Sequence, residues 1–259
     1  MVVKLWDIRG AANLQNMNSN ADFRSKFYEG YFSRQASRSG NTDLSLKIRD
    51  DHFRYADEIL PHLPSNKNAR ITELGCGYGS LLLFLKEHGY TAKGLDVSEE
   101  QVQKAGELGV EAEVADIVAW SFSGDADQDV VLAIDLIEHF DKPELYDLIC
   151  ALKNRLKPGG KIICRTPNMD AIRPTEYAFG DFTHGALLNP SSATQLFLSA
   201  GFDKVKVHAS SVKVRGAKNF FRSILWGAFT LQEKLKLFAS GRSTKGMIAT
   251  PNLVIVAEK

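Results

Sequence analysis

The glycine-rich run Glu73–Gly79, with the sequence ELGCGYG, restricts this chain more than any other feature of its sequence. An apolar run predicted as a strand precedes it, and the apolar run 81–85, predicted as part of a helix, follows it. Glycine tolerates positive φ angles and has no Cβ atom, so the backbone can approach a ligand closely, while a helix N-terminus offers free N–H groups. This order predicts an α/β fold that binds a ligand at the loop.

The remainder of the chain alternates strand-like and helix-like segments. Strands are predicted at 70–74, 91–95, 111–114, 129–134, 160–165, 204–209 and 251–257, and helices at 79–88, 98–107, 143–156 and 191–199. Such alternation is typical of βαβ units and a parallel sheet. Another helix is predicted over 44–60, before Pro61. We therefore expect an N-terminal helical cap or lid over 1–67 and a larger domain over 68–259.

A second acid distinguishes the glycine run from a dinucleotide-binding loop. Asp96 ends the next predicted strand, where a carboxylate can accept hydrogen bonds from both ribose hydroxyls. A dinucleotide fingerprint needs a glycine at position 80, but here the third glycine comes one position early and Ser80 follows it. The tighter loop suits the short, zwitterionic methionyl tail of a sulfonium cofactor, whose ammonium group Glu73 can engage directly or through water.

With these residues the chain resembles the class I S-adenosylmethionine-dependent methyltransferases. Other stretches that match the family in order are Gly94–Ser98, Ala115–Ile117, Ala133–Leu136 and Leu156–Gly160. The resemblance implies a Rossmann-like, seven-stranded, mostly parallel sheet of order 3-2-1-4-5-7-6, with helices on both faces and an antiparallel last strand.

The resemblance also implies S-adenosylmethionine as the methyl donor and S-adenosylhomocysteine as the product. By position in the family's motifs, Asp96 would hold the ribose, Asp116 would lie near the adenine, and Asp135 would lie beside the methyl donor. The expected cofactor-binding residues are Glu73, Gly75, Cys76, Gly77, Gly79, Asp96, Val97, Asp116, Ile117, Asp135 and Leu136.

The segment that begins at Asp135 also contains the first candidate for a general base. Glu138 and His139 follow it by three and four residues, so a helical turn would place them on one face with Asp135. An imidazole can be neutral at cytosolic pH, which makes His139 our first choice to remove an acceptor proton. Two alternatives stay open. His139 can simply cap nearby backbone, or the D-x-x-E-H pattern, which is similar to that of ubiquinone-pathway O-methyltransferases, can hold a divalent cation. We expect no metal.

A second polar cluster follows the predicted strand at 160–165. Ligands of such sheets lie beyond the carboxyl ends of the strands, so Arg165, Asn168, Asp181 and His184 are candidates for acceptor contacts. Asp181 and His184 are predicted to form a base and its orienting partner, with a locally hydrogen-bonded loop as the alternative. The G-D-F-T-H stretch ending at His184 resembles methyltransferases of bacterial polysaccharide and O-antigen synthesis.

Charge is distributed unevenly along the chain. Residues 71–203 contain 10 Lys and Arg against 21 Asp and Glu, whereas residues 204–248 contain 10 against Glu233 alone. Residues 218–238 also show apolar residues at helical spacing, which predicts a basic amphipathic insertion at about 213–247. This helix is expected to pack on the core or a second subunit, to lie on an anionic membrane, or to bind an acidic acceptor.

Composition limits the remaining function classes. The sequence has no long uninterrupted apolar run, which leads us to expect a cytoplasmic protein, at most associated with the inner face of the membrane. Cys76, Cys150 and Cys164 lack the paired spacing of a zinc site or a disulfide framework. No nucleic-acid recognition motif occurs, so nucleic acid is not expected as a partner.

The leading hypothesis for the function is methylation of a sugar hydroxyl of a glycan or lipid-linked polysaccharide. A small quinone or phenol is the alternative acceptor. A module that binds S-adenosylmethionine without turnover is the alternative outside enzymes.

Overall fold

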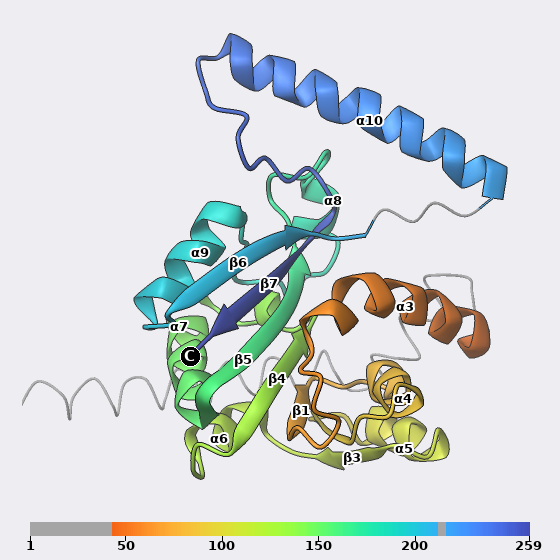
Figure 1. Cartoon of the computed structure of the whole chain (residues 1–259), viewed down its shortest axis with the longest axis vertical. Helices are drawn as coiled ribbons and strands as arrows, with labels where there is room; N and C mark the ends of the chain where they lie inside the picture. Colours follow the sequence, from red (N-terminus) through yellow and green to blue (C-terminus); the bar gives the residue numbers. More distant parts are fainter. Residues whose placement is uncertain (1–42, 212–215) are drawn as a thin grey trace, which may run out of the picture.

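One sheet of seven strands forms the centre of the molecule (Figure 1). The computed structural model describes residues 43–211 and 216–259, with side chains from residue 220 in the second range. The strand order is β3-β2-β1-β4-β5-β7-β6, and β7 runs antiparallel to both of its neighbours. The strands are β1 (Ile71–Leu74), β2 (Ala92–Asp96), β3 (Glu111–Val114), β4 (Gln128–Ile134), β5 (Leu156–Pro167), β6 (Lys204–Ala209) and β7 (Asn252–Glu258). The expected sheet is confirmed.

Helices cover both faces of this sheet. The described helices are α3 (Leu44–Glu58), α4 (Ser80–Glu87), α5 (Glu99–Glu107), α6 (Ile117–Phe122), α7 (Lys142–Arg155), α8 (Thr175–Ala178), α9 (Pro190–Ser199) and α10 (Gly216–Ala239), with 3-10 turns η1 (Leu60–His62) and η2 (Ile137–His139). One core cluster packs α3 and α4 against the sheet, and a second packs α6, α7 and α9 against the other face. The layers are therefore helix, sheet and helix.

Strand β4 shows why the sequence of a central strand is a continuous apolar run. Val130 and Leu132 belong to the core cluster under α3 and α4, whereas Val131 and Ala133 belong to the opposite cluster. Successive side chains of a strand point to opposite faces, and here both faces are buried. A parallel strand between two helical layers consequently has no polar face.

Several elements differ from the sequence prediction, which did not include α8 or η2. β5 begins at Leu156 and not at residue 160, because its first residues extend the ladder to Gln128 of β4. The short helix α6 was not predicted, although Asp116 caps it through its side chain. Of the predicted N-terminal cap, the structure describes residues 43–67, which include α3 and η1, and the rest lies outside the described residues.

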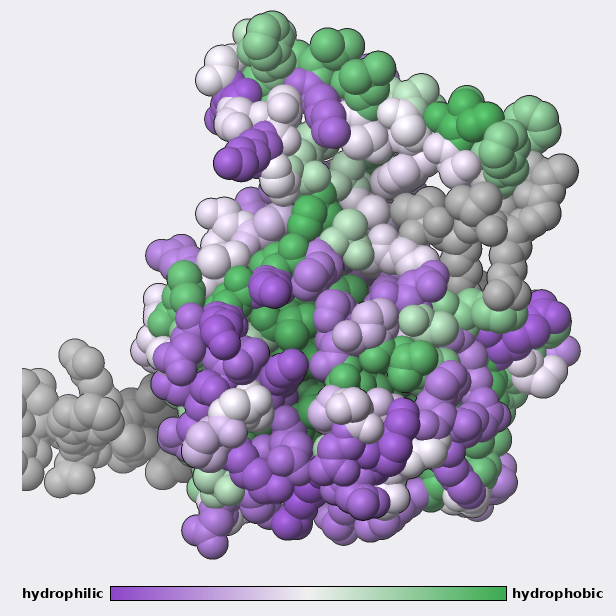
Figure 2. Space-filling model, viewed as in Figure 1, coloured by the Kyte–Doolittle hydropathy of each residue, from purple (hydrophilic) through white to green (hydrophobic). Residues whose placement is uncertain are grey.

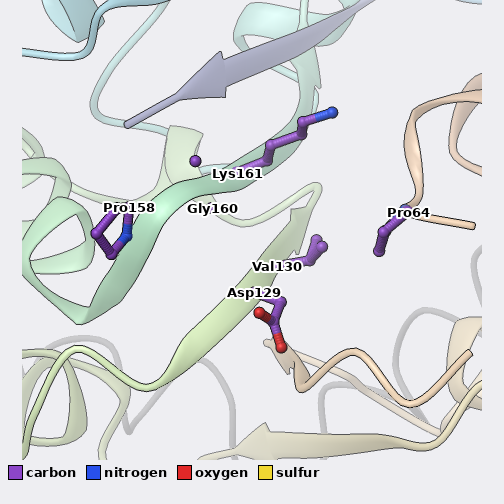
Figure 3. A pocket seen from close by; sticks show the side chains of 7 residues that line it. Pro64, Asp129, Val130, Pro158, Gly160 and Lys161 are labelled. Carbon is purple, nitrogen blue, oxygen red and sulfur yellow. The ribbon is translucent and has the colours of Figure 1, made fainter. Parts of the chain in front are cut away.

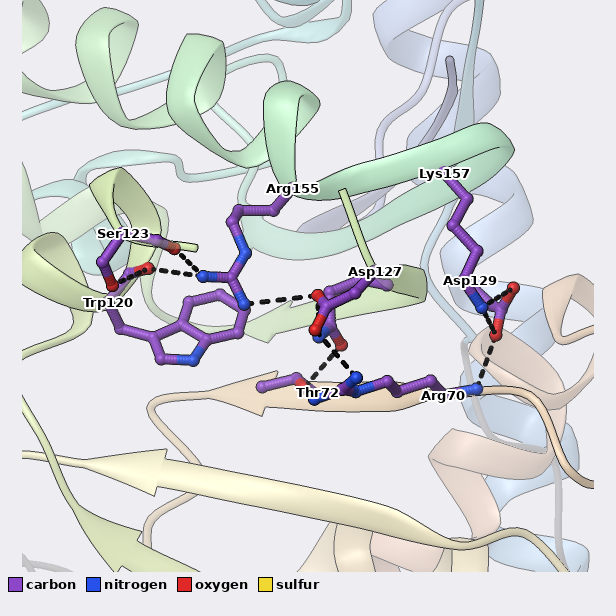
Figure 4. A network of polar contacts seen from close by, with 9 residues as sticks. Arg70, Thr72, Trp120, Ser123, Asp127, Asp129, Arg155 and Lys157 are labelled. Carbon is purple, nitrogen blue, oxygen red and sulfur yellow. Dashed lines mark hydrogen bonds and ion pairs between the residues drawn. The ribbon is translucent and has the colours of Figure 1, made fainter. Parts of the chain in front are cut away.

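Polar contacts stabilise the edge where β1 and β4 begin (Figure 4). The guanidinium of Arg155 lies over the Trp120 ring, 4.1 Å from its centroid, and donates to the Trp120 carbonyl at 3.1 Å. The side chain of Asp127 pairs with Arg70 at 2.8 Å and with Arg155 at 3.3 Å. This network ties the end of α7 to the loop between α6 and β4 at the amino edge of the sheet.

The connection from β6 to β7 emerges at the opposite edge. β6 is parallel to β5, because each of them is antiparallel to β7. The end of β6 at Ala209 and the start of β7 at Asn252 therefore lie at the edge where β1, β4 and β5 end. The long helix α10 belongs to this connection and lies beyond that edge in Figure 1. The predicted amphipathic helix is confirmed, with bounds 216–239.

Gly94 of β2 marks a close approach that the fold requires. A Cβ at this position would lie 2.6 Å from Sγ and 2.7 Å from Cβ of Cys76, both in the glycine-rich loop. We expect Gly94→Ala to lower the free energy of unfolding by about 1–3 kcal/mol, as overpacking does in tight cores. Gly106→Ala in α5 is the matched control, since a Cβ there meets nothing within 4 Å and alanine favours a helix. Urea unfolding of both variants tests this, and equal stabilities would contradict it.

Candidate active site

The glycine-rich loop wraps around the end of β2. The amides of Gly75 and Cys76 both donate to the Leu95 carbonyl, at 2.8 and 3.1 Å. Gly79 then begins α4 with a φ of +82°, a left-handed conformation that side chains other than glycine seldom adopt. The loop therefore keeps the first turn of α4 at the carboxyl edge, between the ends of β1 and β2.

Asp96 supports this loop as well as offering a binding group. Its Oδ2 accepts from the Gly77 amide at 2.9 Å, and its Oδ1 accepts from the Ser98 amide at 2.9 Å. Burial raises the pKa of Asp96, although these backbone hydrogen bonds oppose the shift. A carboxylate oxygen has two lone pairs, so each oxygen can still accept a ribose hydroxyl. The predicted ribose contact fits this geometry.

Glu73 is a buried acid with unused hydrogen-bonding capacity. The residue is 3% exposed, and among the described residues its Oε2 has no hydrogen-bond partner. Burial raises its pKa well above the ordinary value, and the nearby charge of Asp96 raises it further. A buried carboxyl without a partner is costly, so the site is suited to a positively charged ligand group that would relieve this cost.

The end of β4 faces the end of β1 across the point where strand order reverses. Such a switch point is where open α/β sheets bind their ligands. A Cβ on Gly75 would lie 3.0 Å from Cδ1 of Leu136, so the turn after β4 covers the glycine-rich loop closely. Asp135 adopts a positive φ of 52°, a strained conformation for a residue other than glycine. The predicted residues Gly75, Asp135 and Leu136 are thus neighbours.

Asp135, whose side chain is 48% exposed, belongs to an ionic network with two buried residues that the sequence did not reveal. Arg165 Nη1 pairs with Asp135, and Arg165 Nε lies 3.1 Å from Oε2 of Glu58 in α3. Arg165 is 6% and Glu58 3% exposed. Burial alone would lower the pKa of Arg165, but the two carboxylates raise it. An arginine within the apolar run of β5 was the only signal that a partner acid was needed.

Helix α3 also closes over the glycine-rich loop. The Tyr78 hydroxyl donates to Oδ2 of Asp51 at 2.6 Å, and both residues are buried. The Glu58 carboxylate accepts in addition from the Ser211 amide at 2.7 Å. One helix therefore contacts the glycine-rich loop, the end of β5 and the segment after β6.

His139 lies at the end of η2 in a chain of hydrogen bonds. Its Nδ1 is 2.7 Å from Oγ1 of Thr183, and that hydroxyl lies 2.6 Å from Oδ1 of Asp181. The Thr183 hydroxyl has one proton, which it donates to the carboxylate, so it accepts from His139 Nδ1–H. The neutral imidazole then has its lone pair on Nε2. Asp181 thereby orients His139, whereas the sequence had suggested that it would orient His184.

His184 is brought to the same place by backbone contacts. The Gly185 and Ala186 amides donate to the Glu138 carbonyl, at 2.7 and 3.2 Å. A Cβ on Gly185 would lie 2.6 Å from the Phe140 carbonyl oxygen, so only glycine allows this approach. The ring centroids of His139 and His184 are consequently 4.9 Å apart.

Glu138, His139 and His184 each contribute one possible ligand atom, and these atoms lie within 4.8 Å of one another. The family resemblance had suggested Asp135, Glu138 and His139, but Asp135 pairs with Arg165. A set of two imidazoles and one carboxylate suits a transition-metal ion better than magnesium. Burial and the charge of Asp135 raise the pKa of Glu138 from 4.5 to about 8, which favours the protonated carboxyl.

Other predicted residues have structural roles. Cys76 is buried, and burial raises the pKa of its thiol, so it packs as a neutral group. Asp116 caps α6 through Oδ1, which accepts from the Val118 and Ala119 amides. Ile117 is buried beside it, and Val97 is 48% exposed. Asn168 was expected to contact the acceptor. That expectation is wrong, because Asn168 is fully buried and its Nδ2 donates to the carbonyls of Ile248 and Thr250.

A small cavity at the other edge of the sheet is unrelated to these residues (Figure 3). Its volume is about 140 Å³, and it lies between η1 and the amino ends of β4 and β5. The lining residues are Pro64, Asp129, Val130, Pro158, Gly159, Gly160 and Lys161. Ligand pockets for molecules of cofactor size usually measure about 300 Å³ or more. The cavity is therefore too small and too distant to serve the site at the carboxyl edge.

Comparison with known proteins agrees with this geometry. Residues 48–207 match the sequence profile of the methyltransferase domain family. The chain belongs to this family. It is also similar in fold to an S-adenosylmethionine-dependent methyltransferase from Archaeoglobus fulgidus, with a TM-score of 0.65, 19% identity, and coverage of 88% of this chain and 99% of that one. The expected class I methyltransferase fold is confirmed.

Two curated methyltransferases share part of the sequence. Trans-aconitate 2-methyltransferase from Mycolicibacterium gilvum is 32% identical over 56% of this chain and 56% of its own length. Ubiquinone biosynthesis O-methyltransferase from Dinoroseobacter shibae is 30% identical over 54% of this chain and 62% of its own length. The chain thus spans little more than half the length of these relatives.

S-adenosylmethionine is the methyl donor of this methyltransferase family, and the residues at the switch point fit it. Oε2 of Glu73, which has no hydrogen-bond partner among the described residues, suits the ammonium group, and glycines in the loop let a ligand approach its backbone. Asp96 retains lone pairs for the ribose. The buried Glu73 and the half-buried Asp96 beside one loop also favour a ligand that carries positive charge.

Removal of Arg165 tests whether the ionic network holds the methyltransferase site together. Arg165→Leu leaves the buried carboxylate of Glu58 without its ion-pair partner, so we expect a loss of about 3–5 kcal/mol in unfolding free energy. Arg173→Leu is the matched control, because Arg173 and Glu176 form an exposed pair worth at most about 1 kcal/mol. Guanidinium unfolding measures both. If Glu58→Leu fails to restore stability to Arg165→Leu, the proposed coupling is wrong.

The raised pKa of Glu138 predicts a pH-dependent stability. Between pH 4.5 and about 8 the folded chain binds a proton at Glu138 that the unfolded chain has lost. This contribution is full below that window and disappears as pH rises through it, by up to about 1.4 kcal/mol per pH unit. Glu138→Gln cannot titrate, so the native chain should lose stability relative to this variant from pH 5 to 8. Urea midpoints in EDTA measure the difference, and parallel curves would count against the shift.

Proposed function

We propose that this methyltransferase transfers the methyl group of S-adenosylmethionine to a hydroxyl oxygen, with His139 as the general base. The hydrogen-bond chain from Asp181 through Thr183 to His139 supports this proposal most directly. His139 lies four residues after Asp135, which follows the end of β4 beside the glycine-rich loop. An oriented imidazole with its lone pair on Nε2 is the group that removes a proton from an alcohol.

For this reaction the protein mainly has to position the acceptor next to the methyl donor and to remove the acceptor's hydroxyl proton. S-adenosylmethionine supplies an electrophilic methyl group on a sulfonium. The glycine-rich loop, Glu73 and Asp96 hold the donor, and the carboxyl edge of β4 and β5 holds the acceptor in line with it. His139 Nε2 accepts the hydroxyl proton, and the carboxylate of Asp181, through Thr183, stabilises the imidazolium that results. We propose that His184, whose ring centroid lies 4.9 Å from that of His139, contacts the acceptor.

A sugar hydroxyl of a glycan or lipid-linked polysaccharide is the acceptor that we propose. An aliphatic hydroxyl is a weak acid and needs a base as the bond forms, whereas a carboxylate acceptor is already ionised. The G-D-F-T-H loop, which supplies both Thr183 and His184, provides the second argument through its resemblance to enzymes of polysaccharide synthesis.

A small quinone or phenol is the second candidate acceptor. The similarity to a ubiquinone biosynthesis O-methyltransferase favours it. Incubation with labelled S-adenosylmethionine and paired acceptors, a set of glycosides and a set of catechols, distinguishes the two. Label only in the catechols would overturn the glycan proposal. Cofactor binding by calorimetry without label in any acceptor would indicate a module without turnover.

Thr183 provides a specific test of the proposed base. Thr183→Val keeps the shape of the side chain but breaks the link between His139 and Asp181, so we expect kcat to fall about tenfold or more. Thr183→Ser should restore most of the rate, and His139→Gln should cost about 10²–10⁴. Thr194→Val in α9 is the matched control, because its hydroxyl only donates to the Pro190 carbonyl. Full turnover in both Thr183→Val and His139→Gln would show that His139 is not the base.

A further inference from the structure

Helix α10 exposes an apolar face. Eight of its large apolar side chains are exposed, with exposed fractions from 51% for Phe229 to 77% for Phe238. Figure 2 shows hydrophobic side chains along the outer edge of this helix, which Figure 1 places beyond the carboxyl edge of the sheet. The exposed apolar residues are Phe220, Phe221, Ile224, Leu225, Phe229, Leu231, Leu235 and Phe238. An apolar set of this size on one helix marks an interaction surface.

The spacing of these residues defines the face. At 100° per residue, these eight residues occupy one half of the helix circumference, from Phe220 and Phe238 at one limit to Phe229 at the other, so they form one broad stripe along the helix. The half-buried residues occupy the opposite side of the helix. They are Ser223, Trp226, Thr230, Glu233 and Leu237. The stripe therefore points away from the side of α10 that is partly covered.

Basic residues border this stripe on both sides. At 100° per residue, Arg222 lies just beyond one limit of this stripe, next to Phe229, and Lys236 lies just inside that limit. Lys234 lies beyond the other limit, next to Phe220 and Phe238. The acid of the helix, Glu233, is half-buried and pairs with Lys236 at 2.7 Å. Arg242 and Lys245 add positive charge just after the helix. Long basic side chains that flank an apolar face can extend to phosphate groups while the face enters the acyl region.

The charge pattern indicates which partner fits. A second copy of this chain would bring Arg222 and Lys234 towards the same positive charges, which repel. An anionic lipid surface meets both requirements, since its headgroups attract the basic borders and its interior accepts the stripe. Among the described residues, no helix has the length and apolarity needed to span a bilayer. The mode of contact is therefore a helix lying in the plane of the interface.

The position of α10 gives this contact a direction. The connection that contains it leaves β6 and enters β7 at the carboxyl edge, where the candidate site lies. The loop that supplies Asp181 and Thr183 also exposes two aromatic side chains, Phe179 at 76% and Phe182 at 79%. Apolar surface is therefore found at that edge on two separate segments.

We propose that α10 binds in the plane of an anionic membrane and turns the carboxyl edge of the sheet towards the lipid. The inference concerns binding alone, and it does not depend on which acceptor is methylated. An acceptor attached to a lipid would be presented to His139 and His184 without leaving the membrane.

Flotation of the full chain with vesicles tests the proposal. We expect binding to vesicles of phosphatidylcholine with about 30% phosphatidylglycerol, little binding to phosphatidylcholine alone, and a steep loss at about 0.5 M salt, where charges are screened. Ile224→Glu with Leu235→Glu should abolish binding. Arg222→Glu with Lys234→Glu should weaken it by at least about tenfold, since each basic residue near the surface contributes roughly fivefold.

Matched substitutions elsewhere make the result specific. Phe122→Glu replaces an aromatic residue that is 59% exposed on α6, and Lys142→Glu reverses an exposed charge at the start of α7. Both should bind vesicles like the native chain, and all variants should keep the native circular dichroism and S-adenosylmethionine affinity. The proposal is overturned if the native chain ignores anionic vesicles or if the α10 variants still float. It is overturned equally if these variants change only a concentration-dependent self-association seen by light scattering.

Discussion

A buried guanidinium between two carboxylates determines how the carboxyl edge of this molecule is assembled. Arg165 extends from β5 to Asp135 at the end of β4 and to Glu58 in α3. Without these partners the charge could not stay away from water, and without the charge the two acids would repel each other. The same helix reaches the glycine-rich loop through Asp51 and Tyr78. The cap, the donor loop and the strained turn at Asp135 are therefore parts of one ionic assembly.

The two edges of the sheet differ in how well their polar groups are satisfied. At the amino edge, Asp127, Arg155 and Trp120 satisfy one another, and the small cavity nearby has no connection to the candidate site. At the carboxyl edge, Glu73 has an oxygen without a partner among the described residues, and Asp135 has an unusual backbone conformation. Polar groups left unsatisfied or strained in this way are typical of surfaces that receive a ligand.

The sequence predicts the features whose causes are local. The loop from Gly75 to Gly79 and the acid at Asp96 are recognisable because a turn, a strand end and a helix start are close in the chain. The helix at 216–239 was found through its periodicity. The contact of Arg165 with Glu58 spans 107 positions and that of His139 with Thr183 spans 44. No local pattern pairs such residues, so the sequence does not predict the link from Asp181 through Thr183 to His139 or the burial of Asn168.

The loop from Phe179 to Ala186 is attached to the turn after β4 through main-chain atoms. The amides of Gly185 and Ala186 meet the carbonyl of Glu138, and Gly185 lies against the backbone at Phe140. Main-chain anchors do not depend on the side chains at the tip of the loop. Residues such as Phe182 can therefore change in the course of evolution while His139 and His184 keep their separation. Acceptor preference could diverge among related proteins without loss of the proposed proton-transfer chemistry.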